Sequence, residues 1–179
     1  MEKPSQNITE RKKYREKLPS YIKLEDFAKL IKLVRLPSHK LAFILGFHSG
    51  LRVSEVVNLR RENVDLVGKR IFIRDAKGGK DRVVPLPKGF PQKYLGLIPI
   101  SCGSRALQMA FKRYIKKAKL QDPNLRFHSL RHSFAVRCME RGLSLNQIQV
   151  LLGHANISTT NVYTKINPKD ALDKYEELW

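Results

Sequence analysis

The residues best suited to chemistry gather in the last third of the chain. His128 and Arg131 stand three positions apart in the run His-Ser-Leu-Arg-His, within a segment of helical spacing. His154 ends the run Leu-Leu-Gly-His, and Tyr163 follows nine positions later. Upstream, Arg52 lies in Gly-Leu-Arg-Val-Ser-Glu. Each residue alone is ordinary, but two arginines, two histidines and a tyrosine together suit a reaction at a phosphate ester.

The two arginines would neutralise charge on the phosphate. Attack on a phosphodiester places negative charge on the nonbridging oxygens, which preorganised cations must stabilise. Arg52 and Arg131 suit this role because each guanidinium stays charged and can donate two hydrogen bonds. They would do what Mg²⁺ does in many nucleases, so we expect no metal and no other cofactor. His128 and His154 would add hydrogen-bond donors or move protons near neutral pH.

Tyr163 is the candidate nucleophile and Lys77 the candidate general acid. A phenol has an ordinary pKa of about 10, so a positively charged site must help it to lose its proton. The departing 5′ oxygen needs a proton, which Lys77 can supply from the turn Lys-Gly-Gly-Lys. Lys80 ends the same turn, where it is either an alternative acid or a contact to the DNA.

A zinc site is the competing interpretation of the histidines. His128 and His132 are spaced i, i+4, which can hold zinc when a third ligand exists. The sequence has no His-Glu-x-x-His pattern and no cysteine close to the pair, so we favour the metal-free interpretation. Cys102 and Cys138 form no C-x-x-C pair and fit a reducing compartment, although a single disulfide between them stays open.

Hydrophobic spacing predicts a mostly helical domain that positions these residues. The expected helices cover 24–34, a segment ending at Gly50, 51–59, 104–119, 128–140, 145–151, 156–162 and 168–178. Two β-type runs at 70–74 and 82–86 flank the turn that carries Lys77, which predicts a hairpin. Residues 64–66 can supply a third strand. The expected fold is therefore mainly α with a small antiparallel β-sheet.

The length of 179 residues suits one hydrophobic core and so one domain. Residues 1–20 are polar and charged, and we expect a flexible leader or linker remnant there. Residues 21–179 then form the catalytic domain. Its last helix, at about 168–178, has an apolar stripe that either packs on its own domain or docks on a neighbouring protomer.

Charge favours a polyanionic partner. The chain has 35 Lys and Arg against 16 Asp and Glu, a formal net charge of +19, which attracts phosphate backbones. We expect double-stranded DNA; a merely soluble basic protein and an anionic membrane surface are the alternatives. The residues that we expect to contact DNA are basic and lie in the hairpin or on the helix 104–119: Lys80, Arg82, Lys112, Arg113 and Lys116. The helix residues are equally compatible with an ordinary solvated face.

No apolar run approaches membrane-spanning length, and the N-terminus has no signal-peptide core. We therefore expect a cytoplasmic, nucleoid-associated protein with no membrane partner.

The order of these residues resembles the tyrosine recombinase family, which includes phage-type integrases and Xer-like resolvases. That family has Arg, Lys, His-x-x-Arg, His or Trp, and Tyr in order, and here the matching residues are Arg52, Lys77, His128, Arg131, His154 and Tyr163. The runs His-Ser-Leu-Arg-His-Ser-Phe-Ala and Leu-Gly-His-Ala-Asn-Ile-Ser-Thr-Thr are similar too, and the resemblance spans about Leu18 to Trp179. It implies the catalytic-domain fold of the family. It also implies a site-specific recombinase that cleaves and rejoins DNA through a 3′-phosphotyrosyl bond, without metal or ATP.

The resemblance has further implications. It favours Lys77 over Lys80 as the acid, because the family's lysine precedes the small residues of the hairpin. It implies that Glu55 orients the catalytic residues, whereas spacing alone fits a helix-surface carboxylate equally well. It also implies a homo-oligomer on DNA, a tetramer in the family, and a monomer when free. Relatives carry an N-terminal helical domain, so this chain is either a fragment or a short protein.

Two other functions stay open. A type IB topoisomerase-like DNA relaxer would share the Arg, Lys, His and Tyr chemistry. A DNA-binding regulator could keep the fold without the chemistry, although the complete residue set weighs against it.

Overall fold

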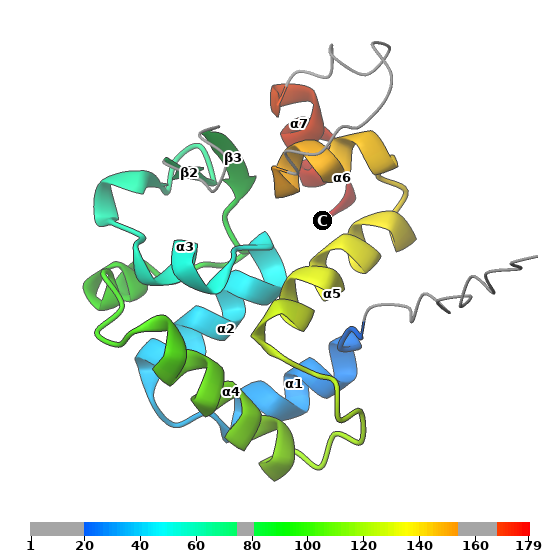
Figure 1. The fold of residues 1–179 in the computed structure, drawn as a ribbon. Coiled ribbons are helices and arrows are strands. Elements are labelled where there is room, and N and C mark those ends of the chain that lie inside the picture. The colour runs from blue at the N-terminus through cyan, green and yellow to red at the C-terminus, as the bar shows by residue number, and fades with distance from the viewer. Residues whose placement is uncertain (1–19, 75–80, 154–167) are drawn as a thin grey trace, which may run out of the picture.

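The structure, a computed structural model, describes residues 20–74, 81–153 and 168–179 (Figure 1). Several predictions fall on other residues and lie outside this description: residues 1–19 of the leader predicted at 1–20, the hairpin turn with Lys77 and Lys80, the helix at 156–162, His154 and Tyr163. The proposed boundary between leader and catalytic domain therefore stays a prediction.

Helices make up most of the described chain. The α-helices are α1 (Leu24–Leu33), α2 (Pro37–Ser49), α3 (Val53–Val57), α4 (Ser104–Lys117), α5 (Phe127–Glu140), α6 (Leu145–Leu152) and α7 (Pro168–Leu178). Two 3₁₀ helices are η1 (Arg61–Asn63) and η2 (Gln92–Leu97). No helix in the described ranges is both long and apolar enough to cross a membrane.

One small sheet accompanies the helices. Its strands are β1 (Val64–Asp65), β2 (Arg70–Ile73) and β3 (Arg82–Pro85), in the order β1-β2-β3 and all antiparallel. Ile71 pairs with Val84, and both side chains are fully buried, so one face of the hairpin packs on the helices. The predicted fold class, mainly α with a small antiparallel sheet, is confirmed.

Local sequence signals set several helix boundaries. Pro37 begins α2, because proline suits the first turn of a helix. α2 then ends at Gly50, whose φ of 68° is left-handed. A capping box begins α6: Ser144 Oγ accepts from the Gln147 N–H at 3.3 Å, and the Gln147 side chain accepts from the Ser144 N–H at 2.9 Å. The short helix η2 was not predicted.

Two hydrophobic cores are joined by α5. The larger core contains Phe127 and Leu130 from the start of α5, together with α1, α2, α4 and the sheet. The smaller core contains Phe134 and Cys138 from later turns of α5, together with α6 and α7. Figure 1 shows α5 running between the two groups of helices. Arg131 falls between Leu130 and Phe134, so it lies at the boundary of the two cores.

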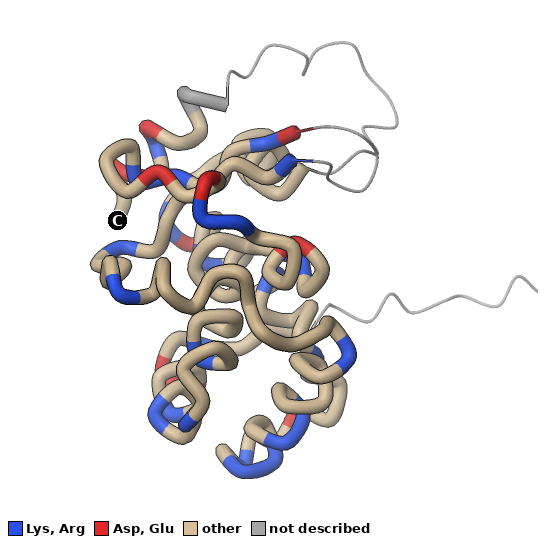
Figure 2. The backbone as a smooth tube through the Cα atoms, turned by 90° about the vertical axis from the view of Figure 1, so that its left-hand side faces the viewer, with Lys and Arg blue, Asp and Glu red and all other residues tan. Residues whose placement is uncertain are grey.

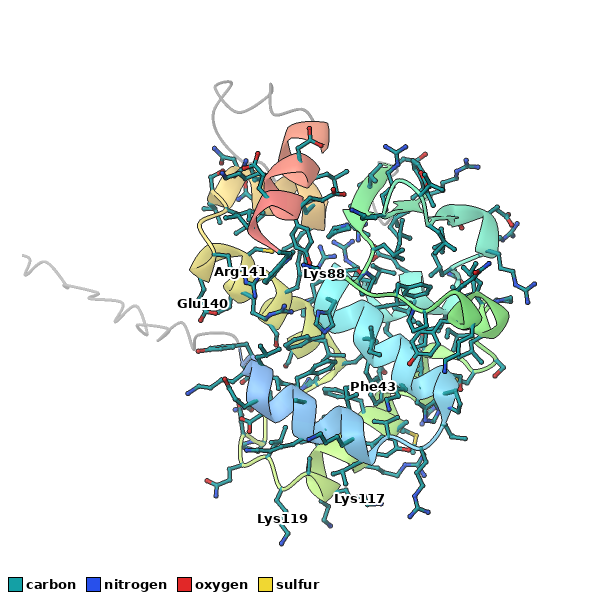
Figure 3. The ribbon with its side chains drawn as sticks, turned by 180° about the vertical axis from the view of Figure 1, so that it is seen from behind. Phe43, Lys88, Lys117, Lys119, Glu140 and Arg141 are labelled. Atoms are coloured by element: carbon teal, nitrogen blue, oxygen red, sulfur yellow. The ribbon has the colours of Figure 1, made fainter. Side chains whose placement is uncertain are left out.

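In this structure the last helix packs on its own domain. Ala171 is fully buried, and the ring centroid of Tyr175 lies 5.9 Å from that of Phe134 on α5. Trp179 contacts the guanidinium of Arg141, with 3.2 Å between that group and the ring centroid. Arg141 and Lys88 lie close to the end of α7 (Figure 3), and Lys88 donates to the Trp179 carbonyl at 2.7 Å.

Candidate active site

Glu55 lies at the centre of a cluster of arginines. Its Oε1 accepts from Arg52 Nη1 and from Arg82 Nη1, both at 2.8 Å. Its Oε2 accepts from the Arg52 backbone N–H and from Arg82 Nη2, both at 2.7 Å. The Glu55 side chain is only 7% exposed. This burial argues against an ordinary helix-surface carboxylate and supports the orienting role implied by the family resemblance.

Arg52 stands where the cluster meets solvent. It is the N-cap of α3, so its own backbone N–H binds the Glu55 carboxylate while its side chain binds the same group. Its side chain is 25% exposed. A polar cleft of about 490 Å³ opens beside it and is also lined by Arg60 and Arg74. Arg52 is therefore both held in place and accessible to a ligand.

Arg82 occupies a different place from the one that we predicted. Its side chain is 5% exposed, and its Nε donates to the Leu151 carbonyl at the end of α6, at 3.1 Å. The other two guanidinium nitrogens bind Glu55. Each of the three guanidinium nitrogens therefore has a partner within the protein, which argues against the predicted direct contact with DNA.

Arg131 binds the ends of two helices. It comes from α5, is 3% exposed, and donates from Nη1 to the carbonyl of Gly50 at 2.8 Å. Nη2 donates to the carbonyl of Leu152, the last residue of α6. Carbonyls at a helix C-terminus carry partial negative charge and attract a cation. Among the described residues, no carboxylate forms an ion pair with Arg131.

The cluster carries an excess of positive charge. Burial alone would raise the pKa of Glu55, but the bonds and charge of Arg82, with the bonds from Arg52, outweigh it and hold the pKa at about 2. Burial, followed by the charges of Arg52 and Arg82, lowers the pKa of Arg131 to about 9. One carboxylate therefore faces three guanidinium groups. An anion with several oxygens would relieve this imbalance.

His128 lies on the same helix as Arg131, in its first turn, and is exposed. Its ring packs edge-on against His132, with 4.6 Å between ring centroids. Burial, and then the charge of Arg131, lowers the pKa of His132. In the part of the chain that the structure describes, no three His, Cys, Asp or Glu residues are placed to hold a metal ion.

Two of the remaining candidate residues, Lys77 and His154, lie close in sequence to residues of this cluster. Lys77 precedes Arg82 by five positions, and His154 directly follows Gly153, the left-handed residue that ends α6. Tyr163 lies between α6 and α7 in the sequence. The structure thus brings together Arg52, Glu55 and Arg131, whereas Lys77, His154 and Tyr163 are outside the described residues.

α4 presents the basic face that the sequence predicted. Its buried side includes Leu107 and Phe111, while Lys112, Arg113 and Lys116 are exposed. Figure 3 shows Lys117 and Lys119 pointing away from the protein at the end of this helix. Lys and Arg outnumber Asp and Glu along the backbone in Figure 2. This exposure is compatible with the predicted DNA contacts and equally with a solvated face.

Sequence reasoning missed the backbone acceptors of the site. The carbonyls of Gly50, Leu151 and Leu152 bind arginines, and all three lie at helix ends. Gly50 and Gly153 were the available signal, because a glycine that ends a helix leaves the last carbonyls free for such donors.

Comparison with known proteins agrees with this fold and site. The profile of the Phage integrase family matches residues 22–96 and 101–170. Tyrosine recombinase XerA of Pyrococcus horikoshii is 34% identical in an alignment that covers 89% of this chain and 61% of that protein. The crystal structure of XerA recombinase aligns with a TM-score of 0.67 at 27% identity, covering 90% of this chain and 65% of that one.

A structure of the XerH site-specific recombinase bound to a palindromic difH substrate aligns with a TM-score of 0.65 at 25% identity. That alignment covers 90% of this chain and 52% of the other. The helical fold with its small antiparallel sheet is that of a tyrosine recombinase catalytic domain. The chain belongs to the phage integrase family. It spans about three fifths of the length of the XerA relative, 61% of it.

Proposed function

We propose that this chain is the catalytic part of a site-specific tyrosine recombinase, which cleaves and rejoins DNA through a 3′-phosphotyrosyl intermediate. The observation that carries the proposal is the buried carboxylate of Glu55, which binds Arg52 and Arg82 and also interacts with the charge of Arg131. Three guanidinium groups against one carboxylate leave positive charge unbalanced, and Arg52 and Glu55 line an open cleft. A phosphodiester supplies the missing negative charge, and its charge grows in the transition state.

The arginines stabilise the reacting phosphate. Arg52, held by Glu55, is accessible from the cleft, and Arg131 is fixed by two helix ends. Both are preorganised, so little reorganisation is required when negative charge develops. His128, one turn before Arg131 on α5, adds a donor or accepts a proton. These groups bring the required positive charge without a metal ion.

The remaining steps use Tyr163, Lys77 and His154. Tyr163 passes its proton to His128, and its oxygen attacks phosphorus to form the phosphotyrosyl bond. The bond from phosphorus to the 5′ oxygen breaks, and Lys77 donates the proton that this oxygen takes up. His154 hydrogen-bonds the phosphate. Attack by a free 5′ hydroxyl reverses the sequence, so rejoining needs no ATP.

The proposed partner is double-stranded DNA, acted on in the cytoplasm at the nucleoid. The XerH relative is bound to a palindromic difH substrate in its solved structure, and this chain carries a net charge of +19, which attracts phosphate backbones. Exposed Lys112, Arg113 and Lys116, together with Lys80, contact the phosphate backbone. We also propose a homo-oligomer, a tetramer, on DNA and a monomer in its absence.

Covalent trapping tests the function. Wild-type protein is incubated with a nicked suicide DNA substrate in EDTA, beside Tyr163→Phe, and run on a denaturing gel. We expect a protein–DNA band that is lost in the variant. No band with any recombination-site DNA, even after the N-terminal domain of a relative is supplied, would refute the proposal.

Two alternatives predict different results. A type IB topoisomerase-like enzyme would relax supercoiled DNA without site preference, again through Tyr163. A DNA-binding regulator would retain all of its DNA activities in Tyr163→Phe.

A further inference from the structure

We propose that Arg82 is a positioning residue of this active site, which fixes both the Glu55 carboxylate beside Arg52 and the end of α6 that precedes His154. The inference rests on the proposed function and deepens it. It assigns to Arg82 a role through other groups in place of the DNA contact that its position in a basic hairpin suggested.

The first part of the role concerns Arg52. Each Glu55 oxygen is shared: Oε1 binds Nη1 of both arginines, and Oε2 binds Arg82 Nη2 and the Arg52 backbone N–H. The bidentate pair with Arg82 fixes the plane of the carboxylate, because two parallel bonds oppose its rotation. Without Arg82, Glu55 could rotate or move with Arg52, and the Arg52 guanidinium would lose its fixed orientation.

The second part concerns α6. Arg82 Nε donates to the Leu151 carbonyl and Arg131 Nη2 to the next carbonyl, that of Leu152. Two arginines, one from β3 and one from α5, therefore bind consecutive carbonyls at the end of this helix. A Cβ at Gly153 would lie 2.5 Å from Arg82 Cδ, so the backbone of that turn packs directly on the Arg82 side chain. His154 is the next residue in the chain.

The third part concerns the strand itself. Arg82 is the first residue of β3 and follows Lys77, the proposed general acid, by five positions. One buried side chain therefore ties together the strand after the acid, the helix that carries Arg52 and Glu55, and the helix that precedes His154. Each of its three guanidinium nitrogens has a partner within the protein, which argues against a direct contact with a DNA backbone.

Kinetics on suicide DNA test the role. Arg82→Lys keeps the positive charge but loses the paired hydrogen bonds to Glu55. We expect single-turnover cleavage at saturating DNA to slow by about 100-fold, which is the size of effect that a misplaced catalytic group produces. DNA affinity should stay within about twofold, because no phosphate contact is removed. Arg70→Lys is the matched control: Arg70 lies on β2 and pairs with Asp65, but its side chain is 46% exposed and away from Glu55.

Two kinetic outcomes would overturn the inference. Weaker DNA binding with an unchanged cleavage rate would make Arg82 a DNA contact. A rate that is unchanged per folded molecule would make it only a stabilising residue. Glu55→Gln, alone and combined with Arg82→Lys, provides a further check: the two losses should not add, because both act through one carboxylate.

A titration separates this inference from the proposed function. Removing the paired hydrogen bonds from Arg82 should raise the pKa of Glu55. NMR of the ¹³C-labelled carboxylate measures this pKa without any DNA. The charged groups facing Glu55 in the described structure are Arg52 on α3, Arg82 on β3 and Arg131 on α5. An unchanged Glu55 titration in Arg82→Lys contradicts the inference. If wild-type protein forms no adduct while the titration shifts, the proposed function fails and the positioning of Glu55 by Arg82 stands.

Discussion

Arg131 donates a hydrogen bond of 2.8 Å to the backbone carbonyl of Gly50, 81 positions earlier in the chain. This contact joins the middle of α5 to the end of α2 and places Arg131 between the two cores. Gly50 is suited to this position because its φ of 68° is left-handed and because no side chain fits there.

Gly50→Ala should destabilise the protein strongly. A Cβ would lie 2.8 Å from Phe134 Cδ1 and 2.9 Å from Leu152 Cδ2, in addition to the left-handed strain. We expect the free energy of unfolding to fall by about 3 kcal/mol, from overpacking plus strain. Gly89→Ala is the control, because its φ is 69° but no atom lies within 4 Å of its Cβ. Gly89→Ala should lower the free energy of unfolding, measured by urea denaturation, by about 1 kcal/mol. Equal losses in the two variants would mean that the predicted clashes at Gly50 are absent.

The arginine cluster should bind simple anions. We expect sulfate to raise the Tm at pH 7.5 above that in chloride of equal ionic strength, and Arg131→Gln to remove most of this gain. Arg70→Gln, which removes an exposed arginine, should leave it intact.

The sulfate effect should also depend on pH in a defined direction. Burial lowers the pKa of Arg131 to about 9, and an anion favours its charged form. The stabilisation by sulfate should therefore be complete below about pH 9 and decline as the pH rises further. A gain at pH 10 equal to that at pH 7.5 would contradict a role for the Arg131 charge.

Acid should destabilise the fold through Glu55. The pKa of Glu55 is about 2 in the folded protein, below its ordinary value of 4.5. A lowered carboxyl pKa contributes stability that is complete above about pH 4.5 and is lost as the pH falls through about 2. Glu55→Gln should therefore flatten the decline of Tm across this window. Glu62→Gln, which changes a carboxylate that is 66% exposed, should leave the decline unchanged.

The exposed face of α4 should contribute affinity without affecting chemistry. We expect Lys112→Ala and Lys116→Ala each to reduce the slope of log affinity against log salt concentration by about 1, whatever the DNA sequence. The cleavage rate at saturating DNA should not change. Lys174→Ala makes the same charge change on α7, at the opposite end of the molecule from α4 in Figure 1, and serves as the control. Equal effects of all three variants would indicate a nonspecific charge effect.

Local elements were predictable from the sequence, because their signals lie within a few residues. The cap at Ser144, the hairpin strands and the amphipathic face of α4 are examples. The contacts of Arg82 were not predictable, because it binds Glu55 and Leu151, which lie 27 and 69 positions away in the sequence. Within a hairpin of lysines, its spacing resembled that of a surface residue. Only tertiary packing shows that its charge is buried.

The candidate site was predictable in its members but not in its connections. Arg52, His128 and Arg131 followed from residue type and order, and the geometry of Arg52 and Arg131 supports their assignment. The backbone carbonyls that hold Arg131 lie 81 and 21 positions away. The glycines at the two helix ends mark free carbonyls but do not show which side chain binds them. The helix η2 was missed since its surroundings, rich in proline and glycine, resembled an irregular connector.

Three arginines around one carboxylate have an evolutionary consequence. Buried charges add little to folding, and well-packed apolar residues in their place are often neutral or stabilising. Removing one member alone is costly, because it leaves a buried charge without its partner. A descendant of this chain that no longer acted on phosphate would therefore replace the whole cluster by apolar residues. Its two hydrophobic cores would be retained for much longer. Among related chains, the presence or absence of these arginines and Glu55 should therefore indicate how recently the site was under selection for activity.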